Sequence, residues 1–280
     1  MSAEILDGKK TSQKLLEELQ AKVEKLPHKP VLAILLVGEN PASLIYVNAK
    51  LKKAKSIGFE TVFAQMSETA TQAEVLAQIE SWNNDDNING ILVQLPLPKH
   101  IDKNAVLNAI APIKDVDGLT PYNSGLFYTG QKPYAMPCTT RGILMLLKEY
   151  NISLEGKHAV VIGRSNLVGK PTAQAMLFEN ATVTTCHSHT QNLADIIKTA
   201  DIVVSAVGEK IVNGKILKNN CVVVDVGIFR TPDGKISGDV EFDSASKVAG
   251  FISPVPGGVG PMTVIALMYN LLDLYLWQVK

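Results

Sequence analysis

Helix-like and strand-like patterns alternate along the whole chain. Residues 30–38 (PVLAILLVG) and 90–95 (GILVQL) are continuous apolar runs that end at a glycine and at a proline pair, as buried parallel strands do. Apolar residues recur at helical spacing over 42–57 and 71–82. The second half repeats this order from the strand 158–162 (HAVVI) onward. The pattern therefore predicts an α/β protein with parallel sheets.

The expected elements fall into two halves of the chain. In the first half we expect strands over 30–38, 61–65 and 90–95, helices over 42–57, 71–82 and 104–110, and a loop over 112–130. In the second half we expect helices over 139–150 and 172–178, and strands over 158–162, 182–186, 202–206, 221–226 and 250–252. A length of 280 residues also favours two domains over one. We place the first domain at 1–138 and the second at 139–261.

The last segment, 262–277, is the longest apolar stretch of the sequence. Asn270 and Asp273 interrupt it, and it falls short of the roughly 20 apolar residues that a membrane helix needs. We therefore expect residues 262–280 to form a buried helix that packs back on the first domain, and we expect no membrane association.

Composition narrows the possible partners and the compartment. Lys and Arg together number 27, as do Asp and Glu, so no overall field attracts nucleic acid or an anionic membrane. The three cysteines, Cys138, Cys186 and Cys221, do not make a disulfide framework. The N-terminal segment is polar and charged, unlike a secretory signal. A cytoplasmic location is expected.

A glycine turn follows the strand 158–162. It runs from Gly163 through Arg164 and Ser165 to Gly169, directly before the helix over 172–178. Glycine at a strand end allows a tight turn, and the backbone amides at the next helix start can face a phosphate. Ser165 replaces the middle glycine of the usual dinucleotide-binding spacing, so an ordinary turn is the alternative. The order of strand, turn and helix favours a Rossmann-type dinucleotide-binding domain.

The residues around this turn favour NADP over NAD. An NAD site usually has an acidic residue at the end of its second strand, but this strand ends in His187, Ser188 and His189. Arg164 is one of only three arginines, and its guanidinium with the Ser188 hydroxyl suits a ribose 2′-phosphate. The alternative for Arg164 is a surface side chain. Because no second Cys/His cluster stands at ligand spacing, no metal site is expected.

A tyrosine and a lysine, Tyr46 and Lys50, lie one turn apart on the helix over 42–57. A tyrosine beside a lysine can hold the amine in place for acid/base chemistry. The alternative is a solvated lysine face, since Lys52, Lys53 and Lys55 follow. The helix pattern alone favours that alternative.

Three further segments carry candidate site residues. Gln94 is the one polar residue of its strand and lies at the carboxyl end, where ligands bind in open α/β sheets. Asp117 lies on a loop and could accept hydrogen bonds from a ring, or could simply belong to an Asp-Gly turn. Pro256 and Gly257 belong to a rigid loop that allows a flat ligand to approach the backbone.

Taken together, five segments strongly resemble one family, the bifunctional methylenetetrahydrofolate dehydrogenase/methenyltetrahydrofolate cyclohydrolases. The segments are 46–50 (YVNAK), 93–98 (VQLPLP), 114–118 (KDVDG), 163–171 (GRSNLVGKP) and 254–263 (PVPGGVGPMT). The resemblance runs from about residue 4 to 276. One departure is Thr140 in 137–141 (PCTTR), where the family commonly has a proline, at a helix start and away from the chemistry.

The resemblance implies a folate-binding catalytic domain, an NADP domain and a reaction sequence. NADP+ takes a hydride from 5,10-methylenetetrahydrofolate, and water then opens the methenyl product to 10-formyltetrahydrofolate. It implies that Lys50 is the acid/base group, that Tyr46 positions it and stacks near the folate, that Gln94 tunes the amine and that Asp117 anchors the pterin. A neutral Lys50 amine also suits the chemistry, because a positive charge beside the cationic intermediate would be repelled.

The remaining assignments follow from the same resemblance. The tetrahydrofolate substrate is expected to contact Pro256 and Gly257 as well as the catalytic residues. We assign NADP to the residues of the second domain Gly163, Arg164, Ser165, Ser188 and Ile228. A homodimer and a role in one-carbon metabolism and purine biosynthesis are also implied.

Two other readings remain open at this point. The first is a single-activity NADP dehydrogenase similar to shikimate dehydrogenase, which would share the glycine turn but has no use for segments 93–98 and 254–263. The second is a catalytically inactive folate- or nucleotide-binding module, against which the intact Tyr46, Lys50, Gln94 and Asp117 argue.

Overall fold

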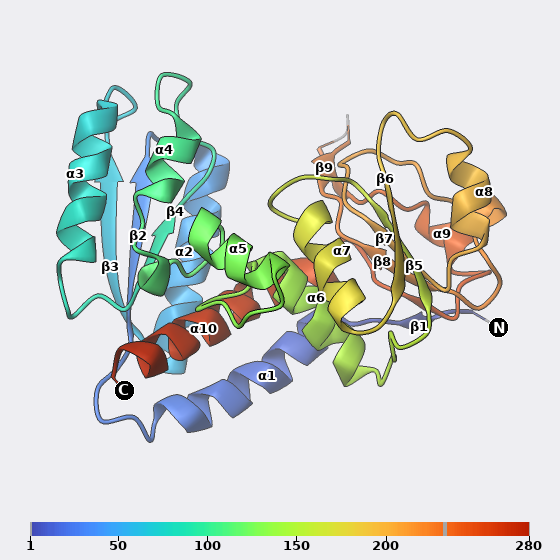
Figure 1. The fold of residues 1–280 in the computed structure, drawn as a ribbon, viewed down its shortest axis with the longest axis horizontal. Helices are drawn as coiled ribbons and strands as arrows, with labels where there is room; N and C mark the ends of the chain where they lie inside the picture. Colours follow the sequence, from blue (N-terminus) through green and yellow to red (C-terminus); the bar gives the residue numbers. More distant parts are fainter. Residues whose placement is uncertain (1, 232–233, 280) are drawn as a thin grey trace. The chain divides into compact units, whose positions relative to one another are not determined.

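The computed structural model describes residues 2–231 and 234–279 (Figure 1). The chain divides into two compact units. The first unit consists of Met1–Lys14 and Thr139–Ile265, and the second of Leu15–Cys138 and Ala266–Lys280. The helices α1 (Gly8–Val23) and α10 (Val259–Gln278) each contribute residues to both units.

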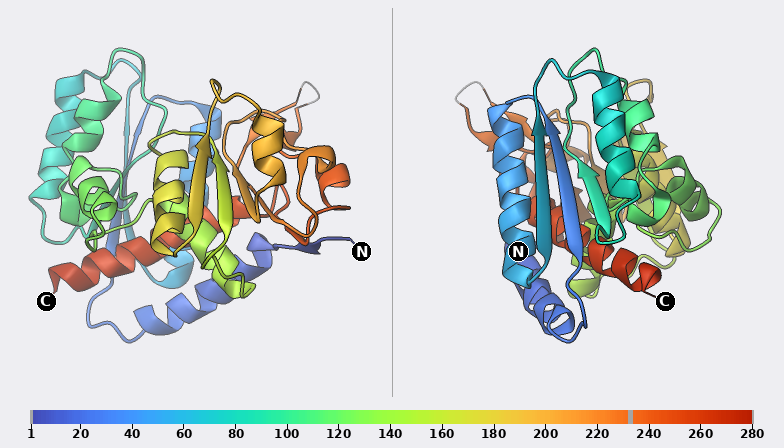
Figure 2. Two further views of the ribbon diagram at one scale, coloured as in Figure 1. Left: turned by 45° about the vertical axis from the view of Figure 1, so that its right-hand side comes forward. Right: turned by 90° about the vertical axis from the view of Figure 1, so that its left-hand side faces the viewer.

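The second unit is built on a three-stranded parallel sheet in the order β3-β2-β4. Its strands are β2 (Val31–Val37), β3 (Glu60–Met66) and β4 (Gly90–Val93). The central strand β2 is apolar throughout and buried on both faces, because helices cover both sides of the sheet. The helix α2 (Pro41–Ile57) covers one face, and α3 (Gln72–Asn83) with α4 (Lys103–Asn108) covers the other (Figure 2).

Local sequence explains where these helices begin. Thr71 caps α3 through a capping box in which its hydroxyl accepts from the Glu74 amide while the Glu74 carboxylate accepts from the Thr71 amide. Asp102 caps α4 by accepting from the amides of Asn104 and Ala105. The apolar side of α3, with Val75, Ile79 and Trp82 buried, packs on the sheet.

The predicted loop over 112–130 is wrong in part. It contains the short 3-10 helix η1 (Pro112–Lys114) and the helix α5 (Pro121–Tyr128). Thr120 caps α5 by accepting from the Asn123 amide, and Pro121 occupies the first turn. These start signals are present in the sequence, but the eight residues of α5 carry too little apolar periodicity to predict a helix.

The first unit is built on a six-stranded parallel sheet in the order β1-β11-β8-β7-β5-β6. Its strands are β1 (Glu4–Ile5), β5 (His158–Ile162), β6 (Thr182–Cys186), β7 (Ile202–Ser205), β8 (Val222–Asp225) and β11 (Phe251–Ile252). A separate antiparallel pair joins β9 (Phe229–Arg230) and β10 (Ile236–Ser237). The helices of this unit are α6 (Cys138–Glu149), α7 (Gly169–Phe178), α8 (Leu193–Lys198) and α9 (Phe242–Ala245), with the 3-10 helix η2 (Gly214–Ile216).

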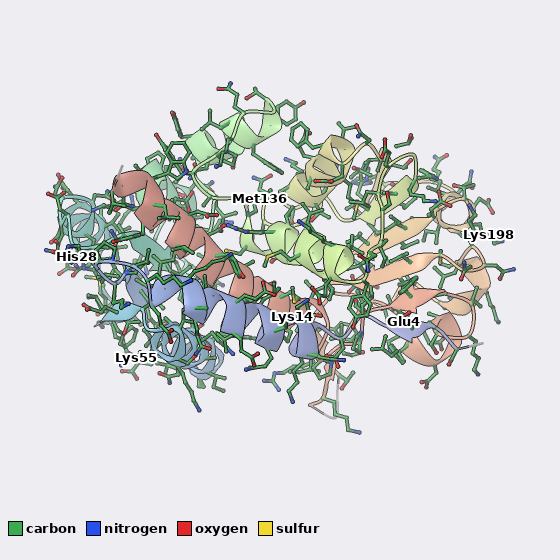
Figure 3. All side chains as sticks on the ribbon, turned by 90° about the horizontal axis from the view of Figure 1, so that it is seen from below. Glu4, Lys14, His28, Lys55, Met136 and Lys198 are labelled. Atoms are coloured by element: carbon green, nitrogen blue, oxygen red, sulfur yellow. The ribbon has the colours of Figure 1, made fainter. Side chains whose placement is uncertain are left out.

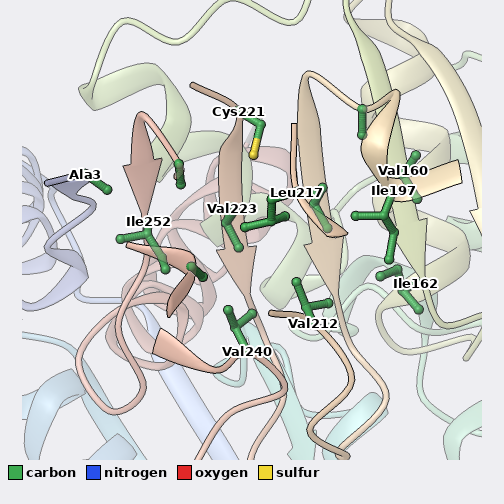
Figure 4. Close-up of a cluster of buried hydrophobic side chains, with 14 of the residues drawn as sticks. Ala3, Val160, Ile162, Ile197, Val212, Leu217, Cys221, Val223, Val240 and Ile252 are labelled. Atoms are coloured by element: carbon green, nitrogen blue, oxygen red, sulfur yellow. The ribbon is translucent and has the colours of Figure 1, made fainter. Parts of the chain in front are cut away.

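The N-terminal residues belong to the second-half domain, which corrects the predicted boundary at 1–138. Glu4 and Ile5 pair with Phe251 and Ile252, so the first strand of the chain completes the sheet of the first unit. Ala3 lies in the same buried cluster as Val223 and Ile252 (Figure 4). A two-residue strand has no alternation that a sequence pattern could reveal, which is why its partner was not predicted.

The C-terminal helix α10 starts at Val259, three residues before the predicted start, and its residues from Ala266 onward belong to the second unit. Among the described residues, it is the one helix long and apolar enough to cross a membrane, with a mean hydropathy of 1.4 in its best window. Of that window, 67% is buried inside the protein. This burial matches the predicted core helix.

A buried lysine closes the end of α3. Lys114 Nζ donates to the carbonyl oxygens of Trp82 (3.0 Å), Asn83 (2.9 Å) and Asp85 (2.7 Å). Burial lowers the pKa of Lys114, and the charges of Asp86 and Asp85 oppose that shift. Lys114 therefore anchors the start of segment 114–118 to the core of the second unit.

We expect Lys114→Met to lower the free energy of unfolding by about 2 kcal/mol, because it leaves three helix-end carbonyls without this donor. Urea unfolding followed by circular dichroism measures the change. The matched control is Lys103→Met, on an exposed position of α4. Equal stability of the two variants would contradict the anchoring role.

Candidate active site

The second unit holds a lysine–glutamine pair at the end of β4. Lys50 Nζ on α2 donates to Gln94 Oε1 at 3.0 Å. Gln94 directly follows β4, is 9% exposed, and its backbone amide donates to the Leu35 carbonyl at 2.8 Å. Its side-chain Nε2 donates to the Leu95 carbonyl at 2.7 Å. Because the amide nitrogen is committed to the backbone, the carbonyl oxygen of the side chain is left to face the lysine.

The lysines of α2 differ in how far they are exposed to solvent. Lys52 and Lys55 are exposed, and Lys55 points away from the protein (Figure 3). Lys50 is partly buried and turned to Gln94. The solvated face that the helix pattern favours therefore holds for Lys52 and Lys55 and not for Lys50.

Tyr46 lies one turn before Lys50 and is 50% exposed. Within the described part of the chain, its hydroxyl makes no hydrogen bond to Lys50, so the structure does not contain the direct Tyr46–Lys50 bond considered in the sequence analysis. An exposed ring at this position is available for stacking on a ligand.

Asp117 is brought to the same side of β4 by the segment that follows η1. Asp115 forms a parallel bridge with Ile91 of β4, which sets Asp117 two residues further on. Desolvation raises the pKa of the Asp117 carboxyl, and the charge of Asp115 raises it further. The charge of Lys50 and a hydrogen bond from Cys138 act in the opposite direction. Lys50, Gln94 and Asp117 therefore belong to one polar region of the second unit.

The helix α10 supplies a residue that the sequence analysis did not assign to the site. Asn270 is fully buried, and its Nδ2 donates to the carbonyls of Val116 at 2.8 Å and Met136 at 2.7 Å. Asn270 thus fixes the position of Val116, the residue before Asp117. Gly118 makes the close approach possible, since a Cβ there would lie 2.7 Å from the Ala135 carbonyl. The sequence does contain a signal for this role of Asn270. It is a lone amide side chain within an apolar helix, and a buried amide needs hydrogen-bond partners.

The first unit holds the glycine turn between β5 and α7. Gly163 has φ +118°, and a Cβ there would lie 2.6 Å from the Ala206 carbonyl. A Cβ on Gly169 would lie 2.2 Å from the Gly163 carbonyl. Only glycine fits either position. The Ser165 hydroxyl accepts from the amides of Val168 and Gly169 and so closes the turn at the start of α7.

The predicted cofactor residues gather at one edge of the six-stranded sheet. Arg164 follows β5, Ser188 follows β6 and Ile228 follows β8, so all three lie beyond carboxyl ends of parallel strands. Arg164, Ser165 and Ser188 are exposed, and Ile228 is 52% exposed. A tight glycine turn with exposed polar groups beside it fits a dinucleotide with a 2′-phosphate.

The remaining predicted residues also lie in the first unit. Pro256 and Gly257 follow β11, and Gly257 has φ +109°. The Gly257 carbonyl accepts from the Lys9 amide at 2.9 Å. They are therefore in a different unit from Tyr46, Lys50, Gln94 and Asp117. No group of three or more His, Cys, Asp or Glu side chains among the described residues could hold a metal ion.

Family models match both parts of the chain. Residues 6–117 match the catalytic domain of tetrahydrofolate dehydrogenase/cyclohydrolase, and residues 137–279 match its NAD(P)-binding domain. The chain belongs to this family.

Individual relatives agree over nearly the full length. The chain is 49% identical to the bifunctional protein FolD of Bacillus thuringiensis (strain Al Hakam), over 98% of this chain and 96% of the relative. It is similar to the crystal structure of the bifunctional methylenetetrahydrofolate dehydrogenase/cyclohydrolase FolD from Campylobacter jejuni, with a TM-score of 0.96, 44% identity and coverage of 99% and 100%.

A third relative bears on the cofactor. The enzyme from Trypanosoma brucei, solved with NADP and an inhibitor, has a TM-score of 0.94 and 36% identity, with coverage of 100% of this chain and 99% of that one. The predicted family, two-part α/β fold, bifunctional folate activity and NADP cofactor are thereby confirmed. The readings as a shikimate-dehydrogenase-like enzyme and as an inactive binding module are not supported.

The raised pKa of Asp117 leads to a pH-dependent prediction. A carboxyl whose pKa is higher in the folded state favours folding most at low pH, and that contribution is lost as the pH rises through the folded-state value. Asp117→Asn removes the charge, so the variant is expected to gain stability relative to the unmodified protein at pH 8 and to gain less at pH 5.

Urea unfolding at the two pH values measures that difference. The control is Asp102→Asn, whose carboxylate is exposed at the start of α4. A stability gain of Asp117→Asn that grows as the pH falls would contradict the assignment.

Proposed function

We propose that Lys50 is the acid/base group of a bifunctional reaction in which 5,10-methylenetetrahydrofolate is oxidised with NADP+ and the methenyl product is hydrolysed to 10-formyltetrahydrofolate. The observation that carries this proposal is the 3.0 Å hydrogen bond between the Lys50 amine and Gln94 at the end of β4. It singles out one lysine of α2 and holds its nitrogen at the strand edge where ligands of parallel sheets bind.

In the oxidation step, the main task of the protein is positioning. When bound, NADP+ supplies the acceptor for the hydride that leaves the methylene carbon. The backbone of the glycine turn at Gly163–Gly169 would hold its phosphates, and Arg164 with Ser188 its 2′-phosphate. Asp117 accepts hydrogen bonds from the pterin ring, and the exposed Tyr46 ring stacks near it.

In the hydrolysis step, Lys50 moves protons. The positive charge of the methenyl substrate favours the neutral amine of Lys50. That amine takes a proton from water as the oxygen bonds to the methenyl carbon. The Lys50 ammonium then gives this proton to N5 as the bond from the carbon to N5 breaks, and the hydroxyl of the adduct releases its own proton to solvent as the formyl C=O forms. The uncharged Gln94 fixes the amine without favouring its protonated form, as a carboxylate would.

We expect Lys50→Met to abolish hydrolysis of methenyltetrahydrofolate, with a loss of at least about 100-fold, because general acid/base catalysis is removed. Dehydrogenation is expected to retain a larger fraction of its rate, since it depends on positioning. Absorbance assays follow NADPH formation and the disappearance of the methenyl compound separately. Parallel runs with NAD+ test the cofactor preference assigned to Arg164.

Lys52→Met is the matched control, because Lys52 lies exposed on the same helix. Equal residual rates for both steps in Lys50→Met would refute the separate role in hydrolysis. A wild-type protein that turns over neither substrate would refute the proposed reaction.

We further propose that the enzyme is a homodimer joined through β6. This strand is at the edge of the six-stranded sheet, pairs with β5 on one side, and leaves Thr185 exposed. Leu177 and Phe178 at the end of α7, just before this strand, are 53% and 43% exposed. An unpaired edge beside exposed apolar side chains supports pairing with the same strand of a second copy.

The direction of the backbone along β6 defines a test. The Thr182 amide donates inward to Lys157, so the amides of Val183 and Thr185 point outward by the two-residue alternation. Thr185→Pro removes an outward donor and spares the bonds to β5. We expect light scattering after size-exclusion chromatography to give a dimer for the unmodified protein and for Thr185→Val, and a monomer for Thr185→Pro.

A dimeric Thr185→Pro variant would contradict this interface. A monomeric unmodified protein would contradict the homodimer itself.

The cellular setting is also a proposal. The three cysteines are buried and none is in a disulfide, which supports a reducing compartment, and we place the enzyme in the cytoplasm. A net charge of zero supports small-molecule partners without nucleic acid or membrane. The 10-formyl product carries an activated one-carbon unit, which supports a role in purine biosynthesis.

A further inference from the structure

Two buried carboxylates lie at the carboxyl ends of β7 and β8, outside the residues assigned to either reaction step. Asp225 ends β8 and pairs in register with Ser205, which ends β7. Asp225 is 3% exposed, and Asp239 is fully buried. Asp225 Oδ1 accepts from the amides of Gly227 (3.1 Å) and Asp239 (2.9 Å), and Oδ2 accepts from the Val240 amide (2.9 Å).

Asp239 binds the loop after β7 in the same manner. Its Oδ2 accepts from the Ser205 hydroxyl at 2.8 Å and from the Val207 amide at 2.7 Å. Its Oδ1 accepts from the Glu209 amide at 2.9 Å. The two side chains together accept one hydroxyl and five backbone donors, so they tie the loops after β7 and β8 to each other.

Two glycines make room for these carboxylates. A Cβ on Gly227 would lie 1.7 Å from Asp239 Oδ1, and a Cβ on Gly238 would lie 2.1 Å from Asp225 Oδ2. Neither distance is compatible with a side chain. Glycine is therefore needed at both positions for the two carboxylates to fit.

The electrostatics of the pair are unfavourable. Desolvation raises the pKa of Asp225 to about 6, and the negative charge of Asp239 contributes to that shift, although three backbone hydrogen bonds oppose it. Within the described residues, neither carboxylate has a Lys, Arg or His partner at ion-pair distance. Buried, unneutralised carboxylates cost stability, and such groups gather where function needs them.

The loops that the pair holds carry exposed apolar side chains. Val207 is 41% exposed and Ile228 is 52% exposed. Both follow carboxyl ends of neighbouring parallel strands, which is where a dinucleotide binds in this type of sheet. Two exposed aliphatic side chains on adjacent loops suit the flat face of a cofactor ring.

We propose that Asp225 and Asp239 are positioning residues for NADP, which act by fixing the loops 206–209 and 226–228 so that Val207 and Ile228 can pack on the cofactor. This inference rests on the proposed function, since it places the cofactor at the carboxyl edge of the six-stranded sheet. The carboxylates themselves touch backbone and Ser205, and their effect on the cofactor is transmitted through the two loops.

The test uses the whole chain with Asp239→Asn, which keeps the size of the side chain and replaces one acceptor oxygen by the NH2 group of an amide, a donor. We expect the Kd for NADP+, measured by isothermal titration calorimetry, to rise about tenfold, the effect of one good hydrogen bond. The KM for NADP+ should rise in step, while kcat at saturating NADP+ keeps more than half its value. Cyclohydrolase activity on added methenyltetrahydrofolate should stay within twofold, because it needs no hydride acceptor.

The matched control is Asp243→Asn, an exposed aspartate on α9 that should change none of these quantities. Ser205→Ala provides a second variant that leaves both carboxylates and removes a single bond to Asp239, with an expected two- to fourfold rise in Kd. If Asp239→Asn does not fold, Ser205→Ala decides the question.

An unchanged Kd in the folded Asp239→Asn variant, or in Ser205→Ala when the other variant does not fold, would overturn the positioning role. Parallel losses of dehydrogenase and cyclohydrolase activity would overturn it as well, because they indicate general destabilisation. Failure of the proposed reaction is distinguishable, since the unmodified protein would then bind NADP+ without turnover.

Discussion

Parallel pairing is the constraint on which both units depend. In a parallel sheet every strand ends at the same edge, so residues far apart in sequence arrive together just beyond the strands. This brings Gln94 to the lysine of α2 in one unit, and places Arg164, Ser188 and Ile228 along one edge in the other. Both faces of such sheets must be buried, which accounts for the unbroken apolar run of β2 and for the valine- and isoleucine-rich strands β5, β7 and β8, each with one polar residue at an end.

Buried polar side chains fix the conformation of the loops that follow the strands. Lys114 ties the start of segment 114–118 to the carbonyls at the end of α3, and Asn270 of α10 donates to the carbonyl of Val116 within the same segment. Asp225 and Asp239 accept backbone amides in the other unit. All four meet backbone groups that lack a partner in a helix or strand ladder, which would otherwise be costly to bury. The conformation of each loop therefore depends on buried side chains that bind its backbone.

Features encoded by local sequence patterns could be predicted, and features that depend on long-range contacts could not. Long apolar runs and glycine turns are local, so most strands, the helices α2, α3 and α7, and residues such as Lys50 and Gln94 were predicted from sequence or resemblance. The pairing of β1 with β11 and the bonds of Asn270 depend on partners more than a hundred residues away. The short helix α5 lacks periodicity. No local pattern encodes such features, because only the folded chain brings the partners together.

The pairing of β1 with β11 also constrains how the protein is made. Glu4 and Ile5 leave the ribosome long before their partners Phe251 and Ile252, because more than 200 residues separate the two strands. While those residues are being made, β1 has no edge to join, and the sheet lacks a strand. Long-range pairing of this kind is slow to form and leaves edges exposed meanwhile. The sheet of the nucleotide-binding unit is thus complete only after β11 has been made, and a chain that stalls before residue 250 presents β8 as an open strand.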